Sequence, residues 1–175
     1  DLPVVISTVP YSTQEACRLM GELRTALLSE AQNYGTHAES YGAMQSCLAW
    51  NTIYDPCKDR ICSPVSRNWN RGKGGTLFCW DTFFASLMFS LGDKKLSYLN
   101  VKAILDEMTE DGMIPNTNLR SASNKDHSRP LVGSMVTEKI YERYSDVEFL
   151  REVYPKLLRW NTWFCENRTT EDGFM

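Results

Sequence analysis

The segment Gly74–Asp93 reads GGTLFCWDTFFASLMFSLGD, and its only charged side chain between Thr76 and Leu91 is Asp81. Charged side chains are rarely buried unless they are paired or hydrogen-bonded. The apolar residues that follow Asp81 predict a helix that starts there and ends at Leu91 or Gly92. The carboxylate can cap the first turn of this helix, or it can point into a cavity and bind a ligand. Its position alone does not choose between these roles.

The composition is that of a soluble globular protein. Of the 175 residues, 42% are hydrophobic and 23% are charged, which excludes a disordered chain and suffices to build a core. The 19 basic and 22 acidic residues give a net charge of -3, so we expect no nucleic-acid partner. The longest apolar run, Phe83–Leu91, is too short to cross a bilayer, and no signal peptide is recognisable. We expect neither a membrane segment nor a cofactor.

A series of helix signals runs along the chain. Capping-box patterns occur at Ser12–Glu15, Thr36–Glu39 and Ser145–Glu148, and each precedes apolar residues at helical spacing. Pro155 is expected to divide or kink the last helical region. Together the signals predict six helices: Ser12–Gly35, Thr36–Tyr54, Asp81–Gly92, Asp93–Gly112, Ser128–Ile140 and Ser145–Trp163.

Strand signals are slight and occur only at Val4–Ile6 and Thr76–Phe78. The serial helices therefore predict an all-α array, and the lack of a fixed repeat disfavours a solenoid. Two long polar segments, Asp55–Cys79 and Gly112–His127, interrupt the helices. Long ordered loops in a helical domain are usually functional. If both segments lie at one end of the array, they form a polar floor over an apolar barrel.

The cysteines match no zinc-binding pattern, because their spacings are wrong and no histidine lies beside them. The six are Cys17, Cys47, Cys57, Cys62, Cys79 and Cys165. We expect a mixture of buried thiols and one bridge, for which Cys57 and Cys62 are the geometric candidates. Asn167–Thr169 is an N-glycosylation sequon. These features favour a secreted or secretory-pathway protein, and a cytoplasmic location is the alternative.

Three motifs occur in the order seen in inverting glycoside hydrolases that have an (α/α)6 barrel: Trp80–Phe84, Asp111–Asn116 and Asp126–Leu131. Further matches are Ala49–Tyr54, Ser63–Arg67 and Tyr154–Leu157, the last followed by Trp160 and Trp163. Over roughly residues 40–175 the chain resembles glycoside hydrolase family 63, the family of processing α-glucosidase I and its relatives. The family 37 trehalases are more distant.

The resemblance implies an all-α fold, an (α/α)6 toroid of which this chain supplies about half as the N-terminal portion of one catalytic domain. It also implies an inverting, exo-acting, α-glucosidase-like hydrolase that cleaves α-linked gluco-oligosaccharides, with this segment lining the glycone subsite. The expected partners are the oligosaccharide substrate and the remainder of the same catalytic domain. Trehalases carry an Arg where this chain has Thr76, which argues against a trehalase.

The same resemblance assigns residues to the subsite. Trp80 and Asp81 line it, and Asn116 contributes an amide. The other expected substrate-binding residues are Phe78, Arg67, Trp69 and His127. A solvated loop is the alternative for Arg67 and Trp69, and a loop hydrogen-bond partner is the alternative for His127. Related enzymes show Ser-Gln-Pro-Pro where this chain has Ser128–Leu131, which leaves the contacts of that loop open.

Neither catalytic carboxylate is assigned to this chain. Inversion needs two carboxylates roughly 6.5–9.5 Å apart, and the resemblance places both beyond Met175, so the segment alone is expected to be inactive. A general acid needs a raised pKa, whereas a carboxylate that accepts from sugar hydroxyls stays ionised, so we assign Asp81 to binding. Two alternatives without catalysis stay open: a carbohydrate-binding domain, and a helical interaction module whose Trp and Tyr residues are only core.

Overall fold

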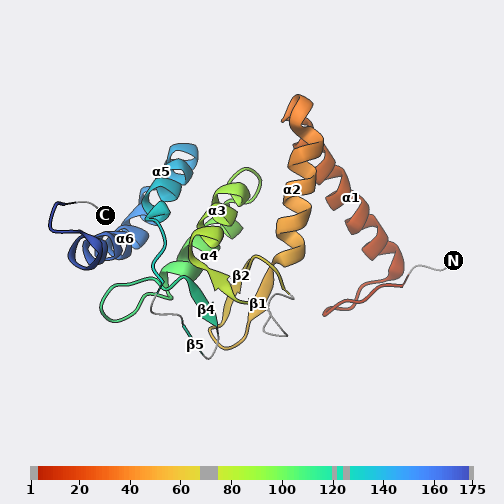
Figure 1. Cartoon of the computed structure of the whole chain (residues 1–175). Helices are drawn as coiled ribbons and strands as arrows, with labels where there is room; N and C mark the ends of the chain where they lie inside the picture. Colours follow the sequence, from red (N-terminus) through yellow and green to blue (C-terminus); the bar gives the residue numbers. More distant parts are fainter. Residues whose placement is uncertain (1–3, 68–74, 120–121, 124–126, 174–175) are drawn as a thin grey trace. The chain divides into compact units, whose positions relative to one another are not determined.

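The computed structural model describes residues 4–67, 75–119, 122–123 and 127–173. The chain divides into two compact units, Asp1–Ser46 and Cys47–Met175. The second unit holds the Trp80–Asp81 pair and every segment that bears on the proposed site. Figure 1 labels the α-helices and most of the strands.

The first unit contains α1 (Thr13–Gln32), the short 3₁₀ helix η1 (Gly35–His37) and the beginning of α2 (Ala38–Asn51). The capping box before α1 is confirmed, because the Ser12 hydroxyl accepts from the Glu15 amide and the Glu15 carboxylate accepts from the Ser12 amide. Val4–Ile6 forms no strand, contrary to the prediction.

The predicted apolar stripe of α1 is largely exposed. Ala16 and Ala31 are buried, whereas Met20, Leu23 and Leu27 are each more than 60% exposed. The predicted helix is confirmed. The spacing of its apolar residues shows that they share one face of the helix, but not that this face is buried.

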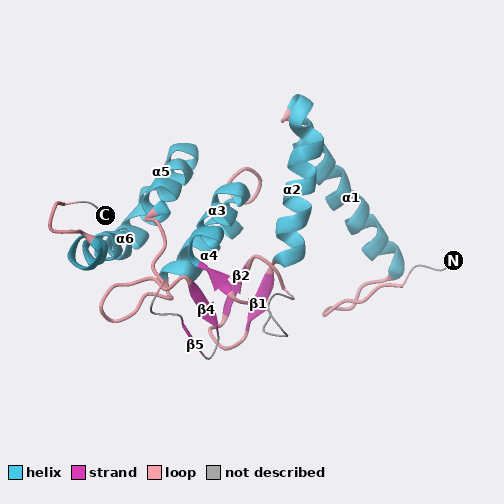
Figure 2. Ribbon diagram, viewed as in Figure 1, coloured by secondary structure: helices cyan, strands magenta, loops and turns pink. Residues whose placement is uncertain are grey.

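The second unit is mostly helical and carries two small antiparallel sheets. Its further helices are α3 (Cys79–Phe89), α4 (Lys94–Leu105), α5 (Val132–Tyr144) and α6 (Val147–Arg168). Its strands are β1 (Ile53–Asp55), β2 (Arg60–Cys62), β3 (Leu77–Phe78), β4 (Thr117–Leu119) and β5 (Ala122–Ser123). The sheet orders are β1-β2 and β3-β4-β5, and Figure 2 shows the strands gathered at one end of the helices. The all-α expectation holds for the helices, and the short strands add to it.

Two helix starts differ from the sequence prediction. The N-cap of α3 is Phe78 and not Asp81, which lies in the first turn instead. The first amide of α3, that of Cys79, donates to the Asn116 carbonyl at 2.9 Å, so a distant backbone group replaces a capping side chain. The α5 helix starts at Val132 and not near Ser128. The Val132 amide donates to the Pro130 carbonyl, which gives the residue between them an inverse γ-turn geometry that is not helical.

Other boundaries are set by local side chains. Asp93 caps α4 as predicted, accepting from the Leu96 amide at 2.8 Å, but α4 ends at Leu105 and not at Gly112. Asp146, and not Ser145, caps α6. Ser145 instead ends α5 in the left-handed conformation, with φ of 49°. The α6 helix is continuous through its internal, exposed Pro155, so the predicted division of this helix is wrong.

The core of the second unit forms where α3, α4, α5 and α6 pack together. The Trp160 ring is fully buried and stacks on Phe83 with centroids 5.6 Å apart, and Trp163 is buried as well. Gly133 on α5 lies against these rings, since a Cβ there would stand 2.7 Å from Phe83 Cζ. The expectation that the two tryptophans pack the core is confirmed.

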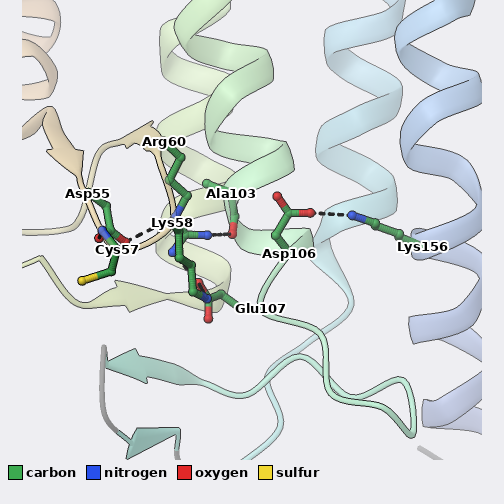
Figure 3. A network of polar contacts seen from close by, with 8 residues as sticks. All are labelled: Asp55, Cys57, Lys58, Arg60, Ala103, Asp106, Glu107 and Lys156. Atoms are coloured by element: carbon green, nitrogen blue, oxygen red, sulfur yellow. Dashed lines mark hydrogen bonds and ion pairs between the residues drawn. The ribbon is translucent and has the colours of Figure 1, made fainter.

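A polar network joins the β1-β2 hairpin to the C-terminal end of α4 (Figure 3). Arg60 donates to the Ala103 carbonyl at 2.7 Å and pairs with Asp55 and Glu107, while Lys58 also pairs with Glu107 at 2.7 Å. The Arg60 and Glu107 side chains are only 14% and 10% exposed. Ion pairs this sheltered keep the hairpin in place, because separating them strands a buried charge.

All six cysteines lie in the described part of the chain and none forms a disulfide, so the predicted bridge between Cys57 and Cys62 is wrong. Cys62 is buried at the end of β2, whereas Cys57 is exposed in the turn that precedes it. The two side chains therefore lie in different environments, and the cysteines give the expectation of a secretory origin no support.

Candidate functional site

The site is built where strand β3 runs directly into helix α3. Leu77 pairs with Asn118 and Phe78 pairs with Thr117, so β3 lies antiparallel to β4. Because β3 belongs to the first long polar segment and β4 to the second, this pairing brings the two segments together. The condition named for the two long polar segments, that they come together, is thus met at these strands.

Asn116 is held between α3 and the segment before α5. Its backbone carbonyl accepts from the Cys79 backbone amide at 2.9 Å, and its backbone amide donates to the His127 backbone carbonyl at 3.0 Å. Its side-chain Oδ1 accepts from Arg129 Nε at 2.8 Å. The residue is 8% exposed, and three hydrogen bonds, one to α3 and two to the segment before α5, fix its backbone and its side-chain oxygen.

Trp80 and Asp81 occupy the first turn of α3 beside Asn116. The Trp80 side chain is 36% exposed, and the Arg129 guanidinium lies over its ring with Cζ 5.3 Å from the centroid. Asp81 and Phe78 are half-buried. Among the described residues, no side chain or backbone amide forms a hydrogen bond or ion pair with the Asp81 carboxylate. The first turn of a helix favours the negative charge of this carboxylate.

Cys79 lies beneath these charges. The pKa of its thiol is raised to about 12, mainly by burial and also by the Asp81 carboxylate, while the Arg129 guanidinium acts in the opposite direction. The charges of Asp81 and Arg129 therefore have opposite effects on the pKa of the same thiol. Since the thiol stays protonated at neutral pH, Cys79 is packing and not a nucleophile.

Three of the predicted site residues remain: His127, Arg67 and Trp69. His127 is exposed, and its backbone carbonyl accepts from the backbone amide of Asn116. Arg67 contacts a different set, since it lies over the Trp50 ring at 4.7 Å and donates to the Thr52 carbonyl at 3.2 Å. Trp69 lies outside the described residues.

Sequence reasoning misses one residue of the site, Arg129. In the sequence it stands out only as a departure from the pattern of related enzymes, although it contacts both Asn116 and Trp80. A charged residue two positions after His127, in a loop rich in polar residues, is the available signal. Its contacts cannot be read from the sequence, because they depend on the β3-β4 pairing.

The described part of the chain contains no cluster of metal-binding side chains, and none of its helices is long and apolar enough to cross a membrane.

Comparison with protein families finds a match that covers residues 76–175 and so more than half of the chain. The matching family is described as the mannosylglycerate hydrolase MGH1-like glycoside hydrolase domain. The chain belongs to this family. It thus carries a glycoside hydrolase domain of the (α/α)6 type, as the resemblance implied, although the match does not single out family 63. Every residue from Trp80 through Arg129 described above falls inside the matched range.

No curated protein matches the chain. A solved structure, that of an uncharacterized conserved protein from Thermus thermophilus, is similar with a TM-score of 0.57 and 20% sequence identity. The similarity covers 70% of this chain but only 31% of that protein. The MGH1-like chain therefore shares its fold with part of a longer protein.

Proposed function

We propose that this MGH1-like chain forms the glycone subsite of an inverting, exo-acting, α-glucosidase-like hydrolase. The observation that supports the proposal most is a group of three side chains within one glycoside hydrolase domain: an exposed indole, a carboxylate without a partner among the described residues, and a fixed amide. These side chains are Trp80, Asp81 and Asn116, and they meet where α3 begins.

The chemistry of the three groups fits a hexose. The apolar face of a sugar ring packs on an indole such as that of Trp80. The Asp81 carboxylate accepts hydrogen bonds from hydroxyls, and charge-assisted bonds of this kind contribute about 1.5–3 kcal/mol each. The side-chain nitrogen of Asn116 donates to a hydroxyl oxygen, since its Oδ1 is already bonded to Arg129. Phe78 adds a half-buried aromatic wall to the same corner.

None of these groups is assigned to proton transfer. The inverting reaction needs an acid and a base on opposite sides of the bond. In our proposal Asp81 accepts hydrogen bonds from the sugar hydroxyls and takes no part in proton transfer. The role of this part of the domain is then to hold the terminal sugar while other carboxylates act on the bond.

A second substrate class is favoured by Arg129. The family is named for a hydrolase of mannosylglycerate, a sugar joined to a small carboxylic acid. Only Nε of the Arg129 guanidinium bonds to a described residue, which leaves both Nη groups for a carboxylate of the substrate. In this alternative the chain serves a hydrolase of sugar–acid conjugates, and Trp80 and Asp81 keep their roles toward the sugar.

The proposal is tested with Asp81→Asn in the full-length protein. Asn keeps the size of the side chain and loses its charge, so the melting temperature should hold while kcat/KM for 4-nitrophenyl α-D-glucoside falls roughly ten- to a hundredfold. Asp106→Asn is the matched control, because this exposed carboxylate pairs with Lys156 on the surface and should change kcat/KM little. Unchanged kcat/KM in Asp81→Asn would remove Asp81 from the subsite. Assays with α-D-mannosylglycerate and α-D-glucosylglycerate distinguish the two substrate classes.

A further inference from the structure

Arg129 joins two of the proposed sugar-binding side chains through one guanidinium. Its Nε donates to Asn116 Oδ1 at 2.8 Å, and its Cζ lies 5.3 Å from the centroid of the Trp80 ring. A guanidinium has five donors and no acceptor. Asn116 must therefore turn its oxygen toward Arg129, and its NH₂ group points the other way.

The rest of Asn116 leaves it no freedom to change this arrangement. Its backbone amide is bonded to the His127 carbonyl and its carbonyl to the Cys79 amide. With the backbone held on both sides and Oδ1 occupied, Nδ2 is the polar atom that remains. It forms no hydrogen bond to any residue in the part of the chain that the structure describes. Asn116 is thus presented to a ligand as a donor and not as an acceptor.

The same guanidinium covers part of Trp80. Arg stacks on aromatic faces both as a cation and as a planar group. Because Trp80 is still 36% exposed, Arg129 leaves part of the indole open to a ligand. A sugar that stacks on Trp80 must then approach from the side that the guanidinium leaves free. One residue thereby sets the orientation of the amide and the usable part of the indole.

We propose that Arg129 is a positioning residue for the glycone subsite, one that fixes Asn116 as a donor and limits Trp80 to one open side. This inference rests on the proposed function. Beside this donor, Asp81 offers an acceptor, so the site takes a sugar with one hydroxyl that accepts from Asn116 and another that donates to Asp81. A deoxy sugar that lacks the hydroxyl accepting from Asn116 should bind more weakly, because the Asn116 NH₂ group then has no hydrogen-bond partner on the sugar.

A double-mutant cycle in the full-length protein tests the role. Arg129→Leu and Asn116→Leu are each expected to lower kcat/KM for 4-nitrophenyl α-D-glucoside about tenfold, the usual effect of one lost hydrogen bond to substrate. The double variant should lose less than the product of the two single losses, because Arg129 acts on kcat/KM mainly through Asn116. Arg129→Gln keeps a side-chain donor for Asn116 Oδ1 and should retain more activity than Arg129→Leu. Melting temperatures show which variants fold, and Arg129→Gln carries the test if Arg129→Leu does not.

A readout without substrate separates this inference from the proposed function. In ¹H–¹⁵N spectra the Arg129 Nε–H should exchange slowly with solvent, and the protection should vanish in Asn116→Leu. If the wild-type protein is active and the two single losses multiply in the double variant, Arg129 acts independently of Asn116 and the positioning role is overturned. A wild-type protein that cleaves neither glucosides nor mannosides removes the proposed function, and the subsite role of Arg129 with it, even where Nε–H is protected.

Discussion

Replacement of Gly133 by Ala should destabilise the second unit, although Ala is the better helix former. Gly133 lies in the first turns of α5, where a Cβ would stand 2.7 Å from Phe83 Cζ and 2.8 Å from Trp160 Cζ3. Favourable carbon–carbon contacts lie near 3.5–4.0 Å, so the methyl group would be about 0.7–1.3 Å too close to both rings. Both rings are fully buried and stacked on each other, which leaves them no open space to move into.

The magnitude follows from two opposed effects. Overpacking of a well-packed core costs typically about 1–3 kcal/mol. The change from Gly to Ala in a helix returns roughly 0.5–1 kcal/mol. The net loss is then about 1–2 kcal/mol, or roughly 4–8 °C in melting temperature for a unit of this size.

Thermal unfolding followed by circular dichroism measures the loss, and two further variants check its cause. Gly21→Ala makes the same change on α1 where nothing lies within 4 Å of the new Cβ, and it should stabilise that helix. Phe83→Leu removes the ring atom nearest to Gly133, so its cost should be smaller beside Gly133→Ala than in the wild-type protein. A Gly133→Ala protein as stable as the wild type, or strictly additive effects in the double variant, would refute the packing argument.

Two more predictions concern charge and thiols. Hydrogen bonds from Lys94 and from the Phe149 amide lower the pKa of Asp146 to about 2, so this group adds stability above about pH 4 that is lost as the pH falls toward 2. The melting temperature of Asp146→Asn, which keeps a capping side chain, should lie below that of the wild type at pH 6 and approach it near pH 2; a constant difference would contradict this linkage. In thiol titration with Ellman's reagent, the exposed thiols should react in the native protein and the buried ones only after unfolding. The exposed thiols are Cys17, Cys47, Cys57 and Cys165, and the buried ones are Cys62 and Cys79. Three or fewer reactive native thiols, together with a mass lower by two hydrogens, would restore the bridge that the structure excludes.

What the sequence determined by itself is local. The capping box at Ser12–Glu15 and the cap at Asp93 are predictable, because a capping side chain and the amide it satisfies lie within three residues of each other. The helical spacing of the α6 tryptophans assigns them to the core, and the glycoside hydrolase character follows from the order of short motifs. Interactions that close within one helical turn leave their signature in consecutive residues.

The tertiary structure alone decided where α3 begins and what surrounds Asp81. Strands of two or three residues are too short to show an alternating pattern, so the β3-β4 pairing is invisible in the sequence. That pairing brings the Asn116 carbonyl to the first amide of α3, which makes a side-chain cap unnecessary and leaves Asp81 in the first turn with no described partner for its carboxylate. It also lets Arg129 contact Asn116 and Trp80 at once. Hydrogen bonds between segments distant in sequence depend on how the chain closes on itself, and no pattern within either segment encodes them.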